Sequence, residues 1–451
     1  MTSGEPVRRS VWPRVLLVLA ALLAAGIAVA WCTRPAAVAE RELTRVLARL
    51  EARGVPTTFE DWSTPAPSRE SNGWPDLLAA VAWRDARVPE GWRRTYVGPW
   101  NHSCEQPWWA TSSEQDMDAL AGFLGSMEPF FERIDVAVAK PTLRWELPPK
   151  DDTGWRFPSP DVLGAGELQR MLLARAHGAP DEPARRHAVV ALARLAGRLD
   201  RRTTVSAALI SRTLLRSACG TLRGLVEARL IDAAAAREDL DALLTVRCID
   251  DMPATIAMER VATCEYVPHL IDGTAFPERS FANTLKSVYA DLRDGRRPFA
   301  RDLDIDRLLA VGLIDALDAA AALQPTWDRS YDERFAACFP QAPEHFAPHN
   351  MLHSMIERSR AVDAQSRLAR VALAACVHHG AHGRWPDGPG ELATLFADGD
   401  VPLDPYTGEA FVWSVDDGVL TLAARPWTAR DEDPLPVVDD PVGWDLVWTL
   451  R

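Results

Sequence analysis

The stretch DEPARRHAVVALARLAGRL, residues 181–199, sets the pattern for this 451-residue chain. Its opening Asp-Glu-Pro is a helix start, because acidic side chains and proline suit the first helical turn. Apolar residues then recur at helical spacing to the end of the stretch. Thr203 and Asp232 stand where they could cap two further segments of the same kind. Residues 161–245 therefore predict successive amphipathic helices, whose short connections favour antiparallel neighbours.

Helical spacing continues on both sides of this centre. Residues 40–53 carry one apolar stripe at i, i+3, i+4 and i+7, and Gly54 ends the segment. Residues 113–132 and most of residues 253–340 show similar spacing. Residues 55–112 are instead dense in Pro and Trp, and they predict an irregular segment.

The pattern changes near the C-terminus. Residues 351–379 form the most apolar of the predicted helices. Residues 411–415 and 419–423 are short β-type runs on either side of Asp-Asp-Gly, which is a strong hairpin turn. Residues 444–450 are expected to add a third strand.

Together these segments predict a mainly α protein with three parts. Residues 1–34 form an N-terminal tail and a single transmembrane helix. Residues 35–345 form a helical-array body with Pro- and Trp-rich irregular segments, and residues 346–451 form a small α+β cap, a long helix followed by a short antiparallel sheet. The hydrophobic share of 47% and charged share of 25% are those of a packed globular protein. The net charge of −13 argues against nucleic acid as a partner.

The membrane segment is VLLVLAALLAAGIAVAWC, residues 15–32, which carries no charge. Its length is just sufficient to span a hydrocarbon core of about 30 Å. Three arginines in the short tail before it favour an N-terminus inside and the bulk of the chain outside. We expect an uncleaved anchor, although the small residues Ala28 and Ala30 leave signal cleavage open.

Two residue types leave alternatives open. Apart from Cys32, six cysteines are scattered along the chain without a CxxC motif, so buried thiols and disulfides are both compatible with the sequence. Seven of the 17 tryptophans lie in residues 55–112. We expect them to pack a loop-rich segment onto helices, and a carbohydrate-binding platform is the alternative.

A motif lies within residues 367–415. A long Ala/Leu helix precedes His382-Gly383-Arg384-Trp385-Pro386, Gly390-Glu391-Leu392 and Pro402-Leu403-Asp404-Pro405-Tyr406-Thr407-Gly408, and a strand pair follows. This arrangement resembles the C-terminus of uncharacterised, singly anchored bacterial envelope proteins and the globular half of the type II secretion major pseudopilin. The chain lacks the methylation-site Glu and the Gly-Phe cleavage site of a pseudopilin. From the residues alone, Pro386 and Pro402 stop helices, and Asp404 with Gly408 shapes a turn.

That resemblance implies a single-pass protein of the bacterial cytoplasmic membrane, with most of the chain on the periplasmic or extracytoplasmic side. It also implies envelope protein partners, in or near a secretion or pilus-like assembly. The membrane itself is the other partner, through residues 15–32.

Motifs of catalysis are missing from the sequence, which has no HExxH, GxSxG, Walker A or GxGxxG. One cluster stands out, since His349, His353 and Glu357 follow one another at four-residue spacing. On a helix they would share one face, where imidazole and carboxylate groups can hold zinc; surface or capping histidines are the alternative. We therefore expect a non-enzymatic binding or scaffold protein without a cofactor, and a metal-dependent envelope hydrolase using this cluster is the rival.

Overall fold

The computed structural model describes residues 35–62, 67–88, 114–144, 162–200, 205–245, 247–271, 303–326, 329–338, 347–425 and 446–451. These residues are mainly helical, with a small three-stranded antiparallel sheet at the C-terminal end. The chain divides into two compact units, each built from two separate stretches of sequence. Both sides of the boundary predicted at residues 345/346 fall in the second unit.

The first unit consists of Met1–Trp62 and Arg260–Leu317. Its described elements are α2 (Pro35–Ala52), α3 (Phe59–Trp62) and parts of α12 (Met252–Ile271) and α14 (Leu303–Ala321). Four apolar residues of α2 share a core with residues of α12 and α14, namely Ala39, Leu43, Val46, Leu50, Cys264, Val267, Val311 and Ile314. The stripe predicted for residues 40–53 is confirmed, and Gly54 ends the helix at a φ of +67°.

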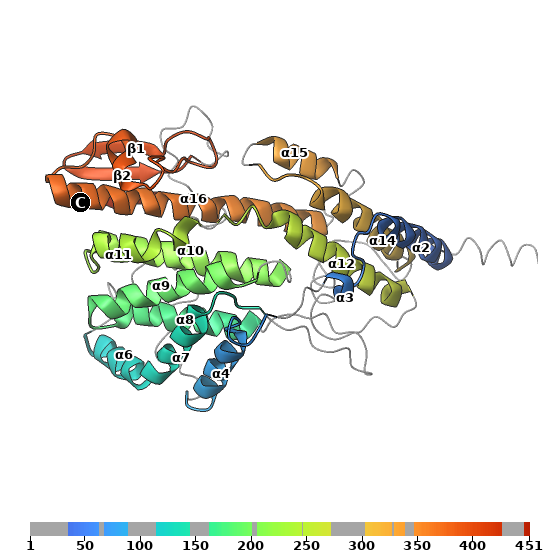
Figure 1. Cartoon of the computed structure of the whole chain (residues 1–451), viewed down its shortest axis with the longest axis horizontal. Coiled ribbons are helices and arrows are strands. Elements are labelled where there is room, and N and C mark those ends of the chain that lie inside the picture. Colours follow the sequence, from blue (N-terminus) through green and yellow to red (C-terminus); the bar gives the residue numbers. More distant parts are fainter. Residues whose placement is uncertain are drawn as a thin grey trace, which may run out of the picture. The chain divides into compact units, whose positions relative to one another are not determined.

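The second unit consists of Ser63–Glu259 and Asp318–Arg451. Its helices are α4 (Trp74–Asp85), α6 (Glu114–Ser126), α7 (Glu128–Ala139), α8 (Val162–Gly178), α9 (Glu182–Arg198), α10 (Val205–Glu227), α11 (Ala233–Leu240), α15 (Arg329–Ala337), α16 (Ala347–His382) and the short 3₁₀-helices η2 (Leu243–Thr245) and η3 (Pro389–Leu395). Within this unit α8, α9, α10 and α16 lie in successive layers, with α4, α6 and α7 beyond α8 and the sheet beyond α16 (Figure 1).

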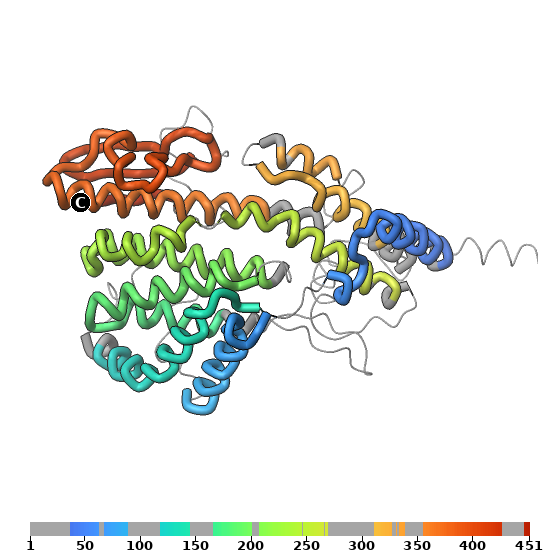
Figure 2. The backbone as a smooth tube through the Cα atoms, in the orientation of Figure 1, coloured from blue at the N-terminus to red at the C-terminus, as the bar shows by residue number. Residues whose placement is uncertain are grey.

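Helices α10 and α16 pack side by side although they are far apart in the sequence (Figure 2). A single cluster of buried apolar residues runs from Trp74 on α4 through these layers to Trp448 in the sheet. The sheet is therefore not a separate module, since its apolar face completes the core of the helical layers.

Two helix starts in this unit confirm the sequence predictions. The Asp181 carboxylate accepts a hydrogen bond from the Ala184 N–H at 2.8 Å and caps α9. The Asp232 carboxylate accepts from the N–H groups of Ala234 at 2.7 Å and Ala235 at 3.1 Å and caps α11. Thr203, predicted to cap α10, lies outside the described residues.

The sheet has the strand order β1 (Val412–Asp416), β2 (Val419–Ala423) and β3 (Val447–Leu450), all antiparallel. Asp417 and Gly418 connect β1 to β2 with φ values of +47° and +77°, as the predicted Asp-Asp-Gly hairpin requires. Leu420 and Leu422 of β2 are fully buried and face the core that α16 and α10 share with the sheet.

One prediction fails in part and one lies outside the structure. Residues 55–112 are not irregular throughout, because α3 and α4 form within them; α4 has Pro at its start and buries Trp74 and Leu77 on its inner side. The predicted membrane segment, residues 15–32, lies outside the described residues. Among the residues that are described, no helix has both the length and the hydropathy to cross a bilayer.

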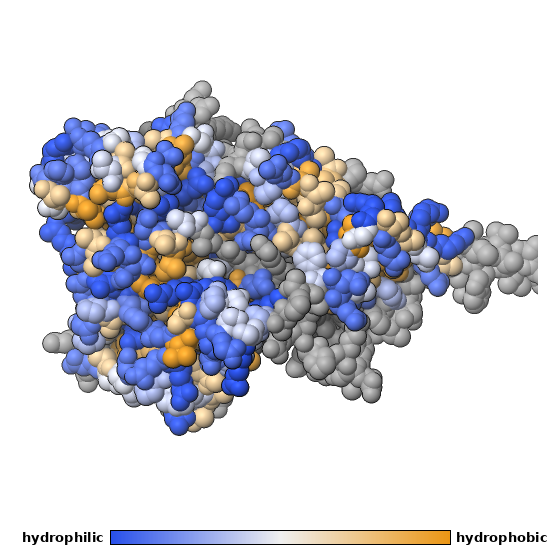
Figure 3. Space-filling view, viewed as in Figure 1, coloured by the Kyte–Doolittle hydropathy of each residue, from blue (hydrophilic) through white to orange (hydrophobic). Residues whose placement is uncertain are grey.

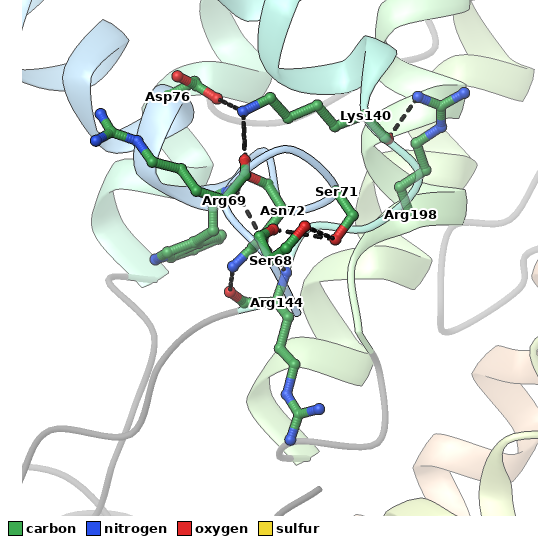
Figure 4. Close-up of polar contacts among 9 residues, drawn as sticks. Ser68, Arg69, Ser71, Asn72, Asp76, Lys140, Arg144 and Arg198 are labelled. Carbon is green, nitrogen blue, oxygen red and sulfur yellow. Dashed lines mark hydrogen bonds and ion pairs between the residues drawn. The ribbon is translucent and has the colours of Figure 1, made fainter. Parts of the chain in front are cut away.

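A polar junction joins three chain segments of the second unit (Figure 4). The Gly73 N–H donates to the Thr142 carbonyl at 2.9 Å, and the Leu143 N–H donates to the Arg198 carbonyl at 2.8 Å. The buried amide of Asn72 donates to the Arg144 carbonyl at 2.8 Å and accepts from the Arg144 N–H at 2.9 Å. This side chain therefore pairs with residue 144 as a strand backbone would.

Lys140 completes the junction (Figure 4). Its ammonium donates to the Arg69 carbonyl at 2.8 Å and forms an ion pair with Asp76 at 2.5 Å. Position 73 of the junction accepts only glycine. A Cβ added at Gly73 would lie 2.1 Å from the Ala137 carbonyl oxygen near the end of α7. The loop before α4 is thereby held against the end of α7.

Candidate functional site

A cavity of about 710 Å³ opens in the second unit between α16, η2, η3, the 399–403 loop and the start of β1. Its size is typical of a pocket for a small molecule. Helix α16 forms one wall with Ser366, Arg367 and Arg370, and η2 with the residues after it contributes Thr245 and Arg247. The cavity is therefore assembled from segments that lie more than 100 residues apart in the chain.

Three arginines give this cavity its charge. Arg370 pairs with Asp241 of the α11 end through Nε at 2.9 Å and Nη2 at 3.3 Å, so the Nη1 edge of its guanidinium is not part of that pair. Arg367 donates from Nη1 to the Leu403 carbonyl at 3.0 Å. Arg247 forms an ion pair with Asp250 at 3.2 Å. Asp400 is the carboxylate among the described residues of the lining.

Another part of the cavity lining is apolar. Phe411 is buried, and the indole N–H of Trp413 donates to the Pro386 carbonyl at 3.0 Å, which fixes the ring. Leu403 also lines the cavity and is 45% exposed. Hydrophilic residues cover much of the face drawn in Figure 3, with hydrophobic residues between them. The lining thus combines cations with aromatic and aliphatic side chains.

The rim of the cavity is built by the Pro402-to-Gly408 part of the motif. Asp404 is buried and accepts from the Tyr406 N–H at 2.9 Å and the Arg425 N–H at 2.6 Å. The Gly408 N–H donates to the Asp404 carbonyl at 2.8 Å, and Gly408 has a φ of +72°. These contacts fit the structural role expected of Asp404 and Gly408, because they close a turn that presents Leu403 to the cavity.

The His382-to-Pro386 part of the motif ends α16. Gly383 has a φ of +70° and its N–H donates to the His379 carbonyl at 2.7 Å. The Trp385 indole N–H donates to the Gly418 carbonyl at 2.8 Å, which ties the helix end to the hairpin turn. Arg384 bonds both oxygens of Glu391 at 2.8 and 3.0 Å, and these bonds lower the pKa of Glu391 to about 2.

A buried carboxylate lies one helical turn before the cavity on α16. Asp363 accepts hydrogen bonds from the N–H groups of Cys248 at 2.7 Å and Ile249 at 3.3 Å. These bonds hold the short segment that connects Arg247 to α12. Burial raises the pKa of Asp363 to about 7, while the two N–H groups and the nearby Arg367 and Arg212 oppose that rise. Asp363 therefore positions the segment that carries Arg247.

The predicted metal ligands all belong to α16. His349, His353 and Glu357 fall within one continuous helix, at the spacing that places them on one face. The side chains of the two histidines lie outside the described residues, and Glu357 bonds Arg360 at 2.9 Å. Among the side chains that are described, no group of three or more His, Cys, Asp or Glu residues could hold a metal ion. The zinc site remains a prediction.

The alternatives left open for cysteine and tryptophan are partly resolved. Five cysteines in the described parts of the chain are free thiols, namely Cys219, Cys248, Cys264, Cys338 and Cys376. Trp74 packs into the core, and Trp83 is partly buried and packs against that core. Cys104 and the tryptophans of residues 89–112 lie outside the described residues.

The arginines of the cavity were not among the residues predicted to act. Arg367 and Arg370 do interrupt the apolar run of α16 at a spacing of three, which was the available indication. Arg247 could not be joined to them, because only the fold brings η2 beside α16. Comparisons of this chain with family models, curated proteins and solved structures find no match.

Proposed function

We propose that this chain is a membrane-anchored envelope protein with a non-enzymatic binding or scaffold role, in or near a secretion or pilus-like assembly. The anchor is residues 15–32, in the bacterial cytoplasmic membrane, with the bulk of the chain on the outer side and envelope proteins as its partners. The resemblance of the C-terminal motif to singly anchored envelope proteins and to the major pseudopilin supports the location.

The observation that carries the binding role is the cavity beside α16. It has the volume of a ligand site and three guanidinium groups, which hold ligands without reacting with them. Its described lining holds Thr245, Ser366 and Asp400 as further polar groups, and no His, Cys or Glu. The continuous core from α4 to the sheet also makes the second unit suitable as a rigid scaffold.

Two measurements on the full-length chain test this role. A photo-crosslinking residue at Val136, which is 58% exposed on α7, should give a discrete protein adduct in the membrane fraction of living cells. The purified chain should not turn over esters, phosphate esters, glycosides or peptides beyond a heat-denatured control. Reproducible turnover, or recovery of the chain in the soluble fraction without any adduct, would contradict the proposal.

The rival function is a metal-dependent envelope hydrolase that uses His349, His353 and Glu357. The observation in its favour is that α16 is continuous across all three positions. Metal analysis of the purified chain, together with the double variant His349→Ala/His353→Ala, separates the two readings. The rival expects about one zinc ion per chain, lost in the variant; a chain without bound transition metal would rule it out.

A further inference from the structure

The cavity beside α16 has a chemistry more specific than a general binding role. Its cationic side is formed by Arg367 and Arg370, one turn apart on the same helix, with Arg247 arriving from a different segment. Guanidinium groups from two directions are the arrangement that proteins use for carboxylate and phosphate groups, because each planar fork can donate two parallel hydrogen bonds.

The pairing of Arg370 leaves room for such an anion. Asp241 accepts from Nε and Nη2 of Arg370, so that ion pair does not use Nη1. Burial and the nearby Arg247 lower the pKa of Arg367, whereas Asp363, Asp250 and Asp404 act to raise it. An anion in the cavity would add to the carboxylates that stabilise this cation.

The apolar part of the lining determines what the anion must carry. Phe411, Trp413 and Leu403 present apolar surface to the same cavity, and the indole N–H of Trp413 is already bonded to Pro386. A small inorganic ion would leave this surface exposed to water, whereas a molecule with an apolar body would cover it. The cavity volume of about 710 Å³ fits a molecule of that size.

We propose that this cavity binds a small organic anion with an apolar body, whose carboxylate or phosphate group contacts Arg247, Arg367 and Arg370. The apolar body lies against Phe411 and Trp413. This inference rests on the proposed binding role and specifies its ligand class.

Calorimetric titration of the full-length chain with four water-soluble probes tests the chemistry. The probes are 3-phenylpropanoate, phenyl phosphate, the neutral 3-phenylpropanamide and inorganic phosphate. At least one aromatic anion should bind at least about tenfold more tightly than both the amide and inorganic phosphate. The tighter of the two anions identifies the head group. If neither aromatic anion binds more tightly than the amide, the proposal is overturned.

Matched variants locate the binding. Arg370→Gln should weaken the preferred anion at least about tenfold, whereas Arg358→Gln, an exposed arginine on the same helix, should not change it. Gly390→Phe should block the cavity without strain, because a Cβ added at Gly390 meets nothing within 4 Å. Unchanged affinity in both Arg370→Gln and Gly390→Phe would place the anion elsewhere and overturn the proposal.

The two proposals can fail separately. If the chain shows no preference for the aromatic anions but still forms the envelope adduct and turns over no substrate, the ligand class is refuted and the scaffold role stands. Turnover of a substrate, with anion binding retained, would instead refute the non-enzymatic role and leave the cavity as a ligand site.

Discussion

His177 shows what burial does to a single titratable residue of this protein. It lies at the end of α8, and burial lowers its pKa from 6.5 to about 3, with a smaller contribution from Arg185. The folded chain therefore excludes a proton that the unfolded chain binds below pH 6.5. The contribution of His177 to stability is fully present above that pH and should fall toward pH 3 by about 1.4 kcal/mol per pH unit. Buried Asp363 and Glu259, whose pKa values are raised to about 7, contribute with the opposite sign, so the test compares variants. In urea unfolding between pH 7 and pH 4, the pH slope of His177→Gln should differ from that of the unsubstituted chain by about this amount, whereas the exposed control His382→Gln should leave the slope unchanged. An equal slope in His177→Gln would contradict the assignment.

At the scale of elements, the junction before α4 depends on one side chain. Asn72→Ala removes the paired hydrogen bonds to the partly buried Arg144 backbone, and the bond that the buried Trp74 N–H donates to the Asn72 Oδ1 at 3.1 Å. We expect a loss of about 2–4 kcal/mol in the free energy of unfolding. Thermal melts should show it, and the nearby Ser71→Ala should cost much less, since the Ser71 hydroxyl bonds within an exposed turn. A loss no larger than that of Ser71→Ala would show that the pairing is dispensable.

The same scale explains which elements could be predicted from the sequence. Helices α9 and α11 and the β1–β2 hairpin were predictable because Asp181, Asp232 and the Asp-Asp-Gly turn act on residues within four positions of themselves. Helix α4 was missed because its Trp and Pro residues are also those of loops, and its packing on α7 is a tertiary contact that the sequence does not display. The arginine cavity was missed for a related reason, since Arg247 and Arg370 meet only through tertiary packing.

At the scale of the whole molecule, the two units have separate cores and should respond separately to damage. Leu50 is fully buried in the first core and Leu192 in the second. Each Leu→Ala substitution should cost about 2–5 kcal/mol in its own unit. Calorimetry should then resolve two transitions, with Leu50→Ala lowering one and Leu192→Ala the other. A single transition lowered by both variants would show that the units unfold together.

The discontinuity of the first unit also has a consequence during synthesis. Helix α2 emerges from the ribosome early, but the helices that cover its apolar stripe follow only after residues 63–259 have been made. At about 5–20 residues per second, the wait is roughly ten to forty seconds. During that interval Leu43, Val46 and Leu50 lack the α12 and α14 residues that complete their core. The order of the chain thus makes α2, the first of the described helices, wait for partners that are synthesised about 200 residues later.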